Sequence, residues 1–184
     1  MKTRPPLPPM LPLREIRSFL TPIWMGIHRS DLAWHRSTSL PDTPSYAMCR
    51  HATAFLKRLL LDADRKNGRN PRSPGALSSR YRVVRGSLDP TRLPEVPEYM
   101  RRDPRHFVLM DDSGDVVDIT ADQFGLDPLA IHQWSAGFEG KPEPCDPGLA
   151  ASAREWARHP TYESILRRPR IGCPTGRQGK TRWD

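Results

Sequence analysis

Cys49, His106 and Asp118 are the three side chains of this sequence that could together perform nucleophilic chemistry. A cysteine attacks a carbonyl as the thiolate, so it needs a base that holds it deprotonated and later protonates the leaving group. Histidine suits both tasks near neutral pH. A carboxylate on the far ring nitrogen fixes the tautomer and stabilises the imidazolium. We therefore interpret Cys49 as a nucleophile, His106 as its base and Asp118 as the residue that orients the base.

The cysteine is expected in or near the first turn of a helix. From residue 52 onward, apolar residues recur with the spacing of one buried helical face, at Ala52, Phe55, Leu56, Leu59 and Leu60. Ser45, directly after Pro44, is expected to cap this helix, which should end near Leu61 or Asp62. A thiol at the positive end of a helix dipole favours the thiolate.

A β-hairpin should carry the histidine and the aspartate. Two β-rich runs, Arg105–Met110 and Asp115–Thr120, flank a turn that ends in Gly114. With Asp112-Ser113-Gly114 as the loop and a left-handed Gly114, Asp111 would face Asp115.

The register of this hairpin decides whether the two side chains meet. The same loop places Val108 opposite Asp118 and His106 opposite Thr120, so His106 and Asp118 become diagonal neighbours on one face, roughly 7–8 Å apart at the backbone. A slip of one residue would separate them. The opposite face would be filled by Phe107, Leu109, Val117 and Ile119.

The other elements are predicted from periodicity and from turn residues. A short helix over Leu13–Leu20 should be limited by Pro22, and a strand is expected over Tyr81–Gly86. Further expectations are a strand over 129–134, helices over Ala150–Arg158 and Thr161–Arg168, and loops over 64–79, 87–104 and 137–147.

Composition favours one domain with irregular parts. The chain has 184 residues, 21 prolines and 36% hydrophobic residues. We expect a Pro-rich arm and short helix over 1–44, a catalytic core over 45–135, and C-terminal helices with a basic tail over 136–184. The net charge of +8 favours an acidic partner surface without selecting its class.

Cysteine spacing argues against a structural metal. Cys49, Cys145 and Cys173 form no CxxC or CxxH pair, so we expect neither zinc nor a disulfide framework, although a Cys145–Cys173 pair stays open. The cysteine content by itself favours a reducing compartment, the cytosol. No secretory signal and no apolar run of membrane-spanning length is visible.

The order of these motifs resembles the papain-like and transglutaminase-like cysteine superfamily. His106-Phe107-Val108 stands where those proteins often have His-Ala-Trp, and Asp118-Ile119-Thr120 is similar to their Asp-Pro-Thr. The run from Asp118 to Gly125 is also similar to papain-fold bacterial toxins and effectors, which include protein-glutamine deamidases. The resemblance covers Tyr46 to Phe124.

The chain departs from the family pattern at three positions. The family often has glycine two residues before the cysteine, where this chain has Ala47, and an aromatic residue after the cysteine, where it has Arg50. The aromatic residue two positions past the histidine is Val108 here. These departures bear on the class of substrate more than on the three candidate catalytic residues.

The resemblance implies an α+β domain in which a cysteine-bearing helix packs on a small antiparallel sheet. It also implies thiol-dependent acyl transfer on an amide, without cofactor or metal. Deamidation of a protein glutamine is the first choice and peptide hydrolysis the second, with transglutamination sharing the same acyl-enzyme. The backbone amide of Cys49 is a candidate oxyanion donor, and Tyr46 and Gln123 are weaker candidates for oxyanion or substrate contacts.

The expected partners are a protein or peptide substrate and an acidic partner or inhibitor protein, and no membrane span is expected. The expected location is the cytoplasm, or a target cell reached without a classical signal peptide. The competing hypothesis is a non-catalytic basic module that binds nucleic acid or acidic proteins, for which Cys49 would be dispensable and salt would weaken binding steeply. A degenerate member of the same fold that only binds partners is a third hypothesis.

Overall fold

The computed structural model describes residues 11–35, 43–87, 105–112, 114–124, 131–133 and 139–167. Residues 1–10 and 36–42 of the predicted N-terminal part, most of the predicted loop at 87–104 and the basic tail with Cys173 lie outside these ranges. The helices are α1 (Leu13–His35), α2 (Cys49–Lys66), α3 (Leu77–Arg80), η2 (Ala121–Phe124, a 3₁₀-helix), α5 (Pro147–Trp156) and α6 (Pro160–Arg167).

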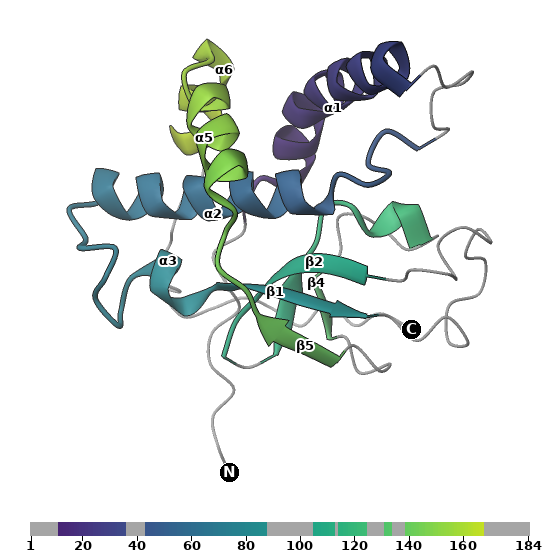
Figure 1. Cartoon of the computed structure of the whole chain (residues 1–184). Helices are drawn as coiled ribbons and strands as arrows, with labels where there is room; N and C mark the ends of the chain where they lie inside the picture. Colours follow the sequence, from purple (N-terminus) through teal and green to yellow (C-terminus); the bar gives the residue numbers. More distant parts are fainter. Residues whose placement is uncertain are drawn as a thin grey trace, which may run out of the picture.

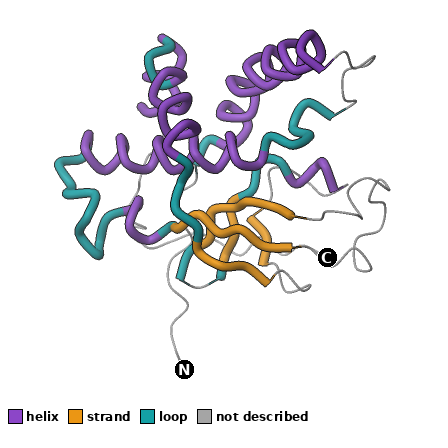
Figure 2. Tube along the Cα trace, viewed as in Figure 1, coloured by secondary structure: helices purple, strands orange, loops and turns teal. Residues whose placement is uncertain are grey.

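The strands form one antiparallel sheet, so the general α+β expectation is confirmed (Figure 2). Its spatial order is β4-β3-β2-β1-β5. The bounds are β1 (Arg82–Ser87), β2 (Arg105–Met110), β3 (Asp115–Val117), β4 (Ile131–Gln133) and β5 (Glu139–Pro142). β1 and β4 agree with the predicted strands within a few residues.

The hairpin register is as predicted. Leu109 pairs with Val117 and Met110 with Val116, the alignment that puts residue 108 opposite residue 118. Gly114 is left-handed, with φ at 85°, a conformation that costs glycine little. The ladder between β2 and β3 ends at the Leu109–Val117 pair, so the strand is shorter than the predicted run, and the segment from Asp118 onward is no longer paired with β2.

The core lies between α2 and one face of the sheet. Side chains of α2, such as Phe55 and Leu59, share a single buried cluster with residues of all three central strands, namely Val83, Leu109 and Val117. Figure 1 shows α2 above the sheet, with α1, α5 and α6 on its other side. The four hairpin residues predicted to share one face do so, because Phe107, Leu109, Val117 and Ile119 all contact this cluster.

Helix α1 is longer than predicted. We expected Pro22 to limit it, but α1 continues through Pro22 to His35. Packing outweighs the lost backbone hydrogen bond, because Ile16, Leu20 and Trp24 are fully buried at helical spacing. Pro22 is exposed, so water can reach the carbonyl that its missing N–H leaves free.

The predicted loop over 137–147 is also wrong in part. Residues 139–142 form β5, which pairs with β1 at the edge of the sheet. Gly140 and Pro142 are poor strand formers, and proline is tolerated on an edge strand because one side of its backbone faces solvent. The pairing with β1 therefore makes this strand, and its own sequence does not predict it.

A buried carboxylate organises the predicted loop over 64–79. Asp64 is fully buried near the end of α2 and accepts hydrogen bonds from the backbone N–H groups of Leu77 and Ser78, at 2.9 and 2.8 Å. The Ser78 hydroxyl donates a third, at 2.6 Å. These bonds fix the start of α3, an element that we did not predict, and Asp64 belongs to α2 because that helix extends to Lys66.

We predict that Asp64→Asn destabilises the chain by about 2 kcal/mol. An amide has one acceptor oxygen, so its NH₂ group would face a buried donor in place of the second carboxylate oxygen. Urea unfolding followed by circular dichroism measures the change. Asp112→Asn is the matched control, because Asp112 is 82% exposed and should change stability by less than about 0.5 kcal/mol. Equal effects of the two substitutions would contradict the prediction.

Candidate active site

Cys49 is the first residue of α2, as the periodicity predicted, but the predicted cap is wrong. The helix begins after Met48 with no side-chain cap. Ser45 is buried, and its hydroxyl donates to the carboxylate of Asp122 instead of accepting from the helix. The first backbone N–H groups of α2 therefore have no capping side chain, which is the arrangement that suits an anion at a helix N-terminus.

Ala47 has a left-handed backbone, with φ at 56°. Residues other than glycine adopt this conformation at a cost of roughly 1 kcal/mol. Ala47 therefore has the backbone conformation for which glycine is best suited. Ala47 is exposed two residues before Cys49, where its methyl group meets little resistance from neighbours.

His106 and Asp118 form a buried hydrogen-bonded pair. The imidazole Nε2 lies 2.6 Å from Asp118 Oδ2, and the two side chains are 0% and 2% exposed. The other oxygen of Asp118 accepts from the backbone N–H and the hydroxyl of Thr120, both at 2.8 Å. Both carboxylate oxygens are thus engaged, and only one orientation of the carboxylate satisfies all three bonds.

Two residues of η2 complete the surroundings of the imidazole. The ring of Phe124 meets that of His106 edge to face, with centroids 4.7 Å apart. Gln123 is buried, and its Nε2 donates to the Thr120 carbonyl at 2.9 Å and lies 3.4 Å from His106 Nδ1. Gln123 therefore contacts the candidate base, and its oxyanion role stays a prediction.

Cys49 reaches the same imidazole. Burial alone would lower the pKa of His106, but the charge and hydrogen bond of Asp118, followed by a hydrogen bond and charge interaction with Cys49, raise the pKa to about 10. Burial likewise opposes ionisation of Asp118, yet His106 and Thr120 hold the pKa of that carboxyl below its usual value. Because Asp118 occupies Nε2, the nitrogen left toward Cys49 is Nδ1.

A polar clamp joins the cysteine segment to the segment that carries the aspartate. Asp122, four residues after Asp118, accepts from Ser45 and is paired with the guanidinium of Arg17 in α1. Arg17 also donates to the backbone carbonyl of Ile119. A third tie comes from His28 of α1, whose Nε2 lies 3.0 Å from the Pro44 carbonyl. The clamp was missed from the sequence, because nothing local indicates that Arg17 approaches Asp122.

Cys49 lines a surface cavity of about 360 Å³. Ala47, Arg50 and Phe107 border it together with residues of β1 and the chain after β5. Arg50 stacks over the Phe107 ring, 5.1 Å from the centroid, so this arginine has an aromatic partner at the border of the cavity. Tyr46 is half-buried in the turn before α2, and its substrate contact stays a prediction.

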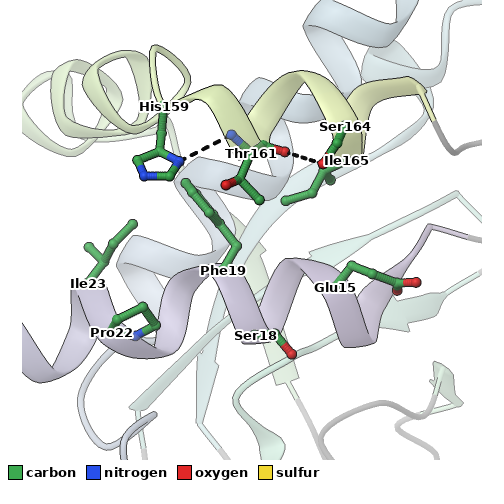
Figure 3. A pocket seen from close by; sticks show the side chains of 9 residues that line it. All are labelled: Glu15, Ser18, Phe19, Pro22, Ile23, His159, Thr161, Ser164 and Ile165. Atoms are coloured by element: carbon green, nitrogen blue, oxygen red, sulfur yellow. Dashed lines mark hydrogen bonds between the residues drawn. The ribbon is translucent and has the colours of Figure 1, made fainter.

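A larger cavity, of about 660 Å³, lies between α1 and α6 (Figure 3). Phe19 and Ile23 of α1 face Ile165 of α6 across it. His159 is the base on its rim, and its Nδ1 accepts from the Thr161 N–H at 3.2 Å. This histidine interacts with the start of α6. Of the three candidate residues, Cys49 borders the smaller cavity, and His106 and Asp118 lie buried behind it.

Within the described ranges, no group of three or more His, Cys, Asp or Glu side chains is placed to hold a metal ion. Searching those same residues for a bilayer-crossing helix found none with sufficient length and apolar character. Comparison of the chain with protein-family models, curated proteins and solved structures found no match. The functional argument therefore rests on the geometry of this site.

The buried pair predicts a distinctive pH dependence of stability. Protonated His106 contributes stability that is complete below its ordinary pKa of 6.5 and is lost as the pH rises to about 10. Ionised Asp118 contributes stability above its ordinary pKa of 3.8, which is lost as the pH falls through its lower folded pKa. We expect the free energy of unfolding of the wild type, relative to a His106→Gln/Asp118→Asn double variant, to be greatest between these ordinary values. A difference that does not decline toward about pH 10 would contradict this expectation.

The clamp predicts that Asp122→Ala costs about 2 kcal/mol of stability and slows alkylation of Cys49. The substitution leaves a partly buried guanidinium with a single carbonyl partner and releases Ser45 from the segment after β3. Urea unfolding and the rate of iodoacetamide labelling at Cys49 measure the two effects. Asp112→Ala is the exposed control and should change neither. Normal labelling in a folded Asp122→Ala chain would show that the clamp does not position the cysteine.

Proposed function

We propose that this chain is a thiol-dependent amidohydrolase or acyltransferase in which Cys49 is the nucleophile, His106 the proton carrier and Asp118 the orienting carboxylate. The observation that carries the proposal is the buried His106–Asp118 hydrogen bond, whose imidazole also interacts with a cysteine at a helix N-terminus. Burying a charged pair costs more free energy than filling the same space with apolar side chains. Titratable groups whose pKa values are strongly shifted by a specific charge partner are common in catalytic sites.

Acylation would proceed as follows. The Cys49 sulfur attacks the carbonyl carbon of the amide, and a carbon–sulfur bond forms while the carbonyl oxygen takes up the electron pair. When the tetrahedral intermediate collapses, the carbon–nitrogen bond breaks and the imidazolium of His106 gives its proton to the departing nitrogen. Asp118 keeps the ring in line through Nε2. The raised pKa of His106 supports this acid role, because the ring stays protonated near neutral pH.

Deacylation would use the same residues in reverse. Neutral His106 takes a proton from water, the resulting hydroxide attacks the thioester carbon, and the carbon–sulfur bond breaks to return the thiolate. The oxyanion in both steps needs donors about 3 Å away. The uncapped first amides of α2, beginning with that of Cys49, are the best candidates for this role.

Protein-glutamine deamidation is the reaction that we favour. Its main support is the resemblance to papain-fold effectors described above. The cavity at Cys49 has room for one amide side chain, and its rim residues Arg50, Arg85 and Arg105 are exposed, so a side chain of a folded protein could enter from solvent. Peptide hydrolysis is the second candidate, because it shares the acyl-enzyme and differs in the amine that departs.

The proposal predicts ammonia release from glutamine substrates that depends on the three residues. We expect Cys49→Ser to lower turnover by at least about 10³-fold and Asp118→Asn by about 10²- to 10⁴-fold, with both chains still folded. The substrates are a blocked Gln-Gly dipeptide and a cell extract, in which mass spectrometry identifies glutamines converted to glutamate. New peptide termini in place of ammonia would identify a peptidase instead.

Cys145→Ser is the matched control and should retain full activity. Burial and the nearby Asp146 raise the pKa of the Cys145 thiol, so iodoacetamide should label Cys49 well before Cys145 at neutral pH. Full turnover by Cys49→Ser would overturn the proposal. So would equal labelling rates at the two cysteines in the wild type.

A further inference from the structure

Three arginines surround the mouth of the Cys49 cavity. Arg50 comes from the first turn of α2, Arg85 from β1 and Arg105 from the start of β2, and all three are exposed. We call these three residues the arginine rim. Glu143 is the carboxylate among the residues that line the cavity, so these side chains carry a formal excess of two positive charges.

The ion pairs of Arg50 and Arg85 are long. The Arg85 guanidinium lies 3.6 Å from Glu143, and that of Arg50 lies 3.7 Å from Asp146. Asp146 uses its other oxygen to cap α5, accepting from the Gly148 N–H at 2.8 Å. These separations exceed a good charge-assisted hydrogen bond. A carboxylate from outside could therefore make shorter, bidentate contacts with these guanidinium groups than their present partners do.

The side chain of Phe107 and the strands β1 and β2 hold the rim arginines in place. The Arg50 guanidinium lies over the Phe107 ring, which orients its plane and reduces the entropy lost on binding. Arg85 and Phe107 pair across β1 and β2, and Arg105 lies two residues along the same strand. Two rim arginines thus stand on paired strands of the sheet, beside the cavity that contains the thiol.

We propose that the arginine rim selects substrates that carry a carboxylate next to the reacting amide, so that the enzyme modifies glutamines in acidic segments of proteins. This inference rests on the function proposed above and names its substrate class. A protein segment fits better than a nucleic acid. The cavity of about 360 Å³ suits a side chain, and Glu143 on its border would repel a continuous phosphate backbone.

The positive potential of the rim can be tested without measuring enzyme turnover, by comparing how fast a charged and a neutral reagent alkylate Cys49. Iodoacetate carries a carboxylate that iodoacetamide lacks, so the ratio of their alkylation rates at Cys49 reports the local potential. At low salt we expect this ratio to be about fivefold higher than for glutathione, and to fall toward that of glutathione as salt is added. Arg85→Gln with Arg105→Gln should remove most of the preference, and Arg154→Gln on α5 should leave it unchanged.

Peptides then test the selection of substrates. We expect Gln flanked by Glu to be deamidated with a kcat/KM about tenfold above that of the same peptide flanked by Lys, and the double rim variant to erase this ratio. A Cys49 alkylation ratio equal to that of glutathione would overturn the inference and leave the proposed function standing. The alkylation preference without turnover of any peptide would overturn the proposed function while the rim remains a carboxylate-binding site.

A third experiment tests whether the arginine rim binds nucleic acid. A fluorescent single-stranded RNA oligonucleotide should bind the wild type and the double rim variant equally weakly at physiological salt. Tight, rim-dependent binding of the oligonucleotide, together with equal rates on the two peptides, would assign the rim to nucleic acid and overturn the inference.

Discussion

The site depends on the hydrogen bond between two buried groups, the His106 imidazole and the Asp118 carboxylate. Neither group could be buried alone, because an unpaired charge in the interior costs several kcal/mol. Thr120 takes up the remaining carboxylate oxygen, so the cluster is satisfied and its geometry is narrowly fixed. The fold must therefore keep the β2–β3 register, since any slip that separates the pair leaves both groups unpaired inside the protein.

The nucleophile belongs to a different part of the chain from this pair, and the structure joins the two through polar contacts. The core between α2 and the sheet brings the helix close, but apolar packing does not specify the position of a helix end to a fraction of an ångström. The Ser45–Asp122 hydrogen bond links the turn before α2 to the segment after β3 directly. Helix α1 adds to this link, because Arg17 binds Asp122 and His28 contacts the Pro44 carbonyl. The Ser45–Asp122 bond explains why Ser45 does not cap the helix, and the uncapped amides are then available to an oxyanion.

The sequence predicted the features that depend on neighbouring residues, and it did not predict those that depend on contacts between distant parts of the chain. The hairpin register followed from Gly114 and from residues within a few positions of it, and the buried face of α2 followed from helical periodicity. The continuation of α1 through Pro22 and the formation of β5 depend on partners far away in the chain. The same reason applies to the Ser45–Asp122 contact, because a serine before a helix has a strong local preference that only the tertiary structure overrides.

Two of the three departures noted from the sequence, Ala47 and Arg50, border the cavity at Cys49, whereas the third, Val108, is buried. Ala47 keeps a left-handed backbone at a small energetic cost, so the cysteine turn has the conformation expected for glycine. Arg50, next to the cysteine, stacks on Phe107 and adds a positive charge to the cavity mouth. Cys49, His106 and Asp118 are the catalytic residues that we propose, and Arg50 contributes positive charge to the cavity that Cys49 borders. If Cys49 is the nucleophile that we propose, selectivity between amides would be determined by the residues that border the thiol, since the side chains of the buried pair are only 0% and 2% exposed.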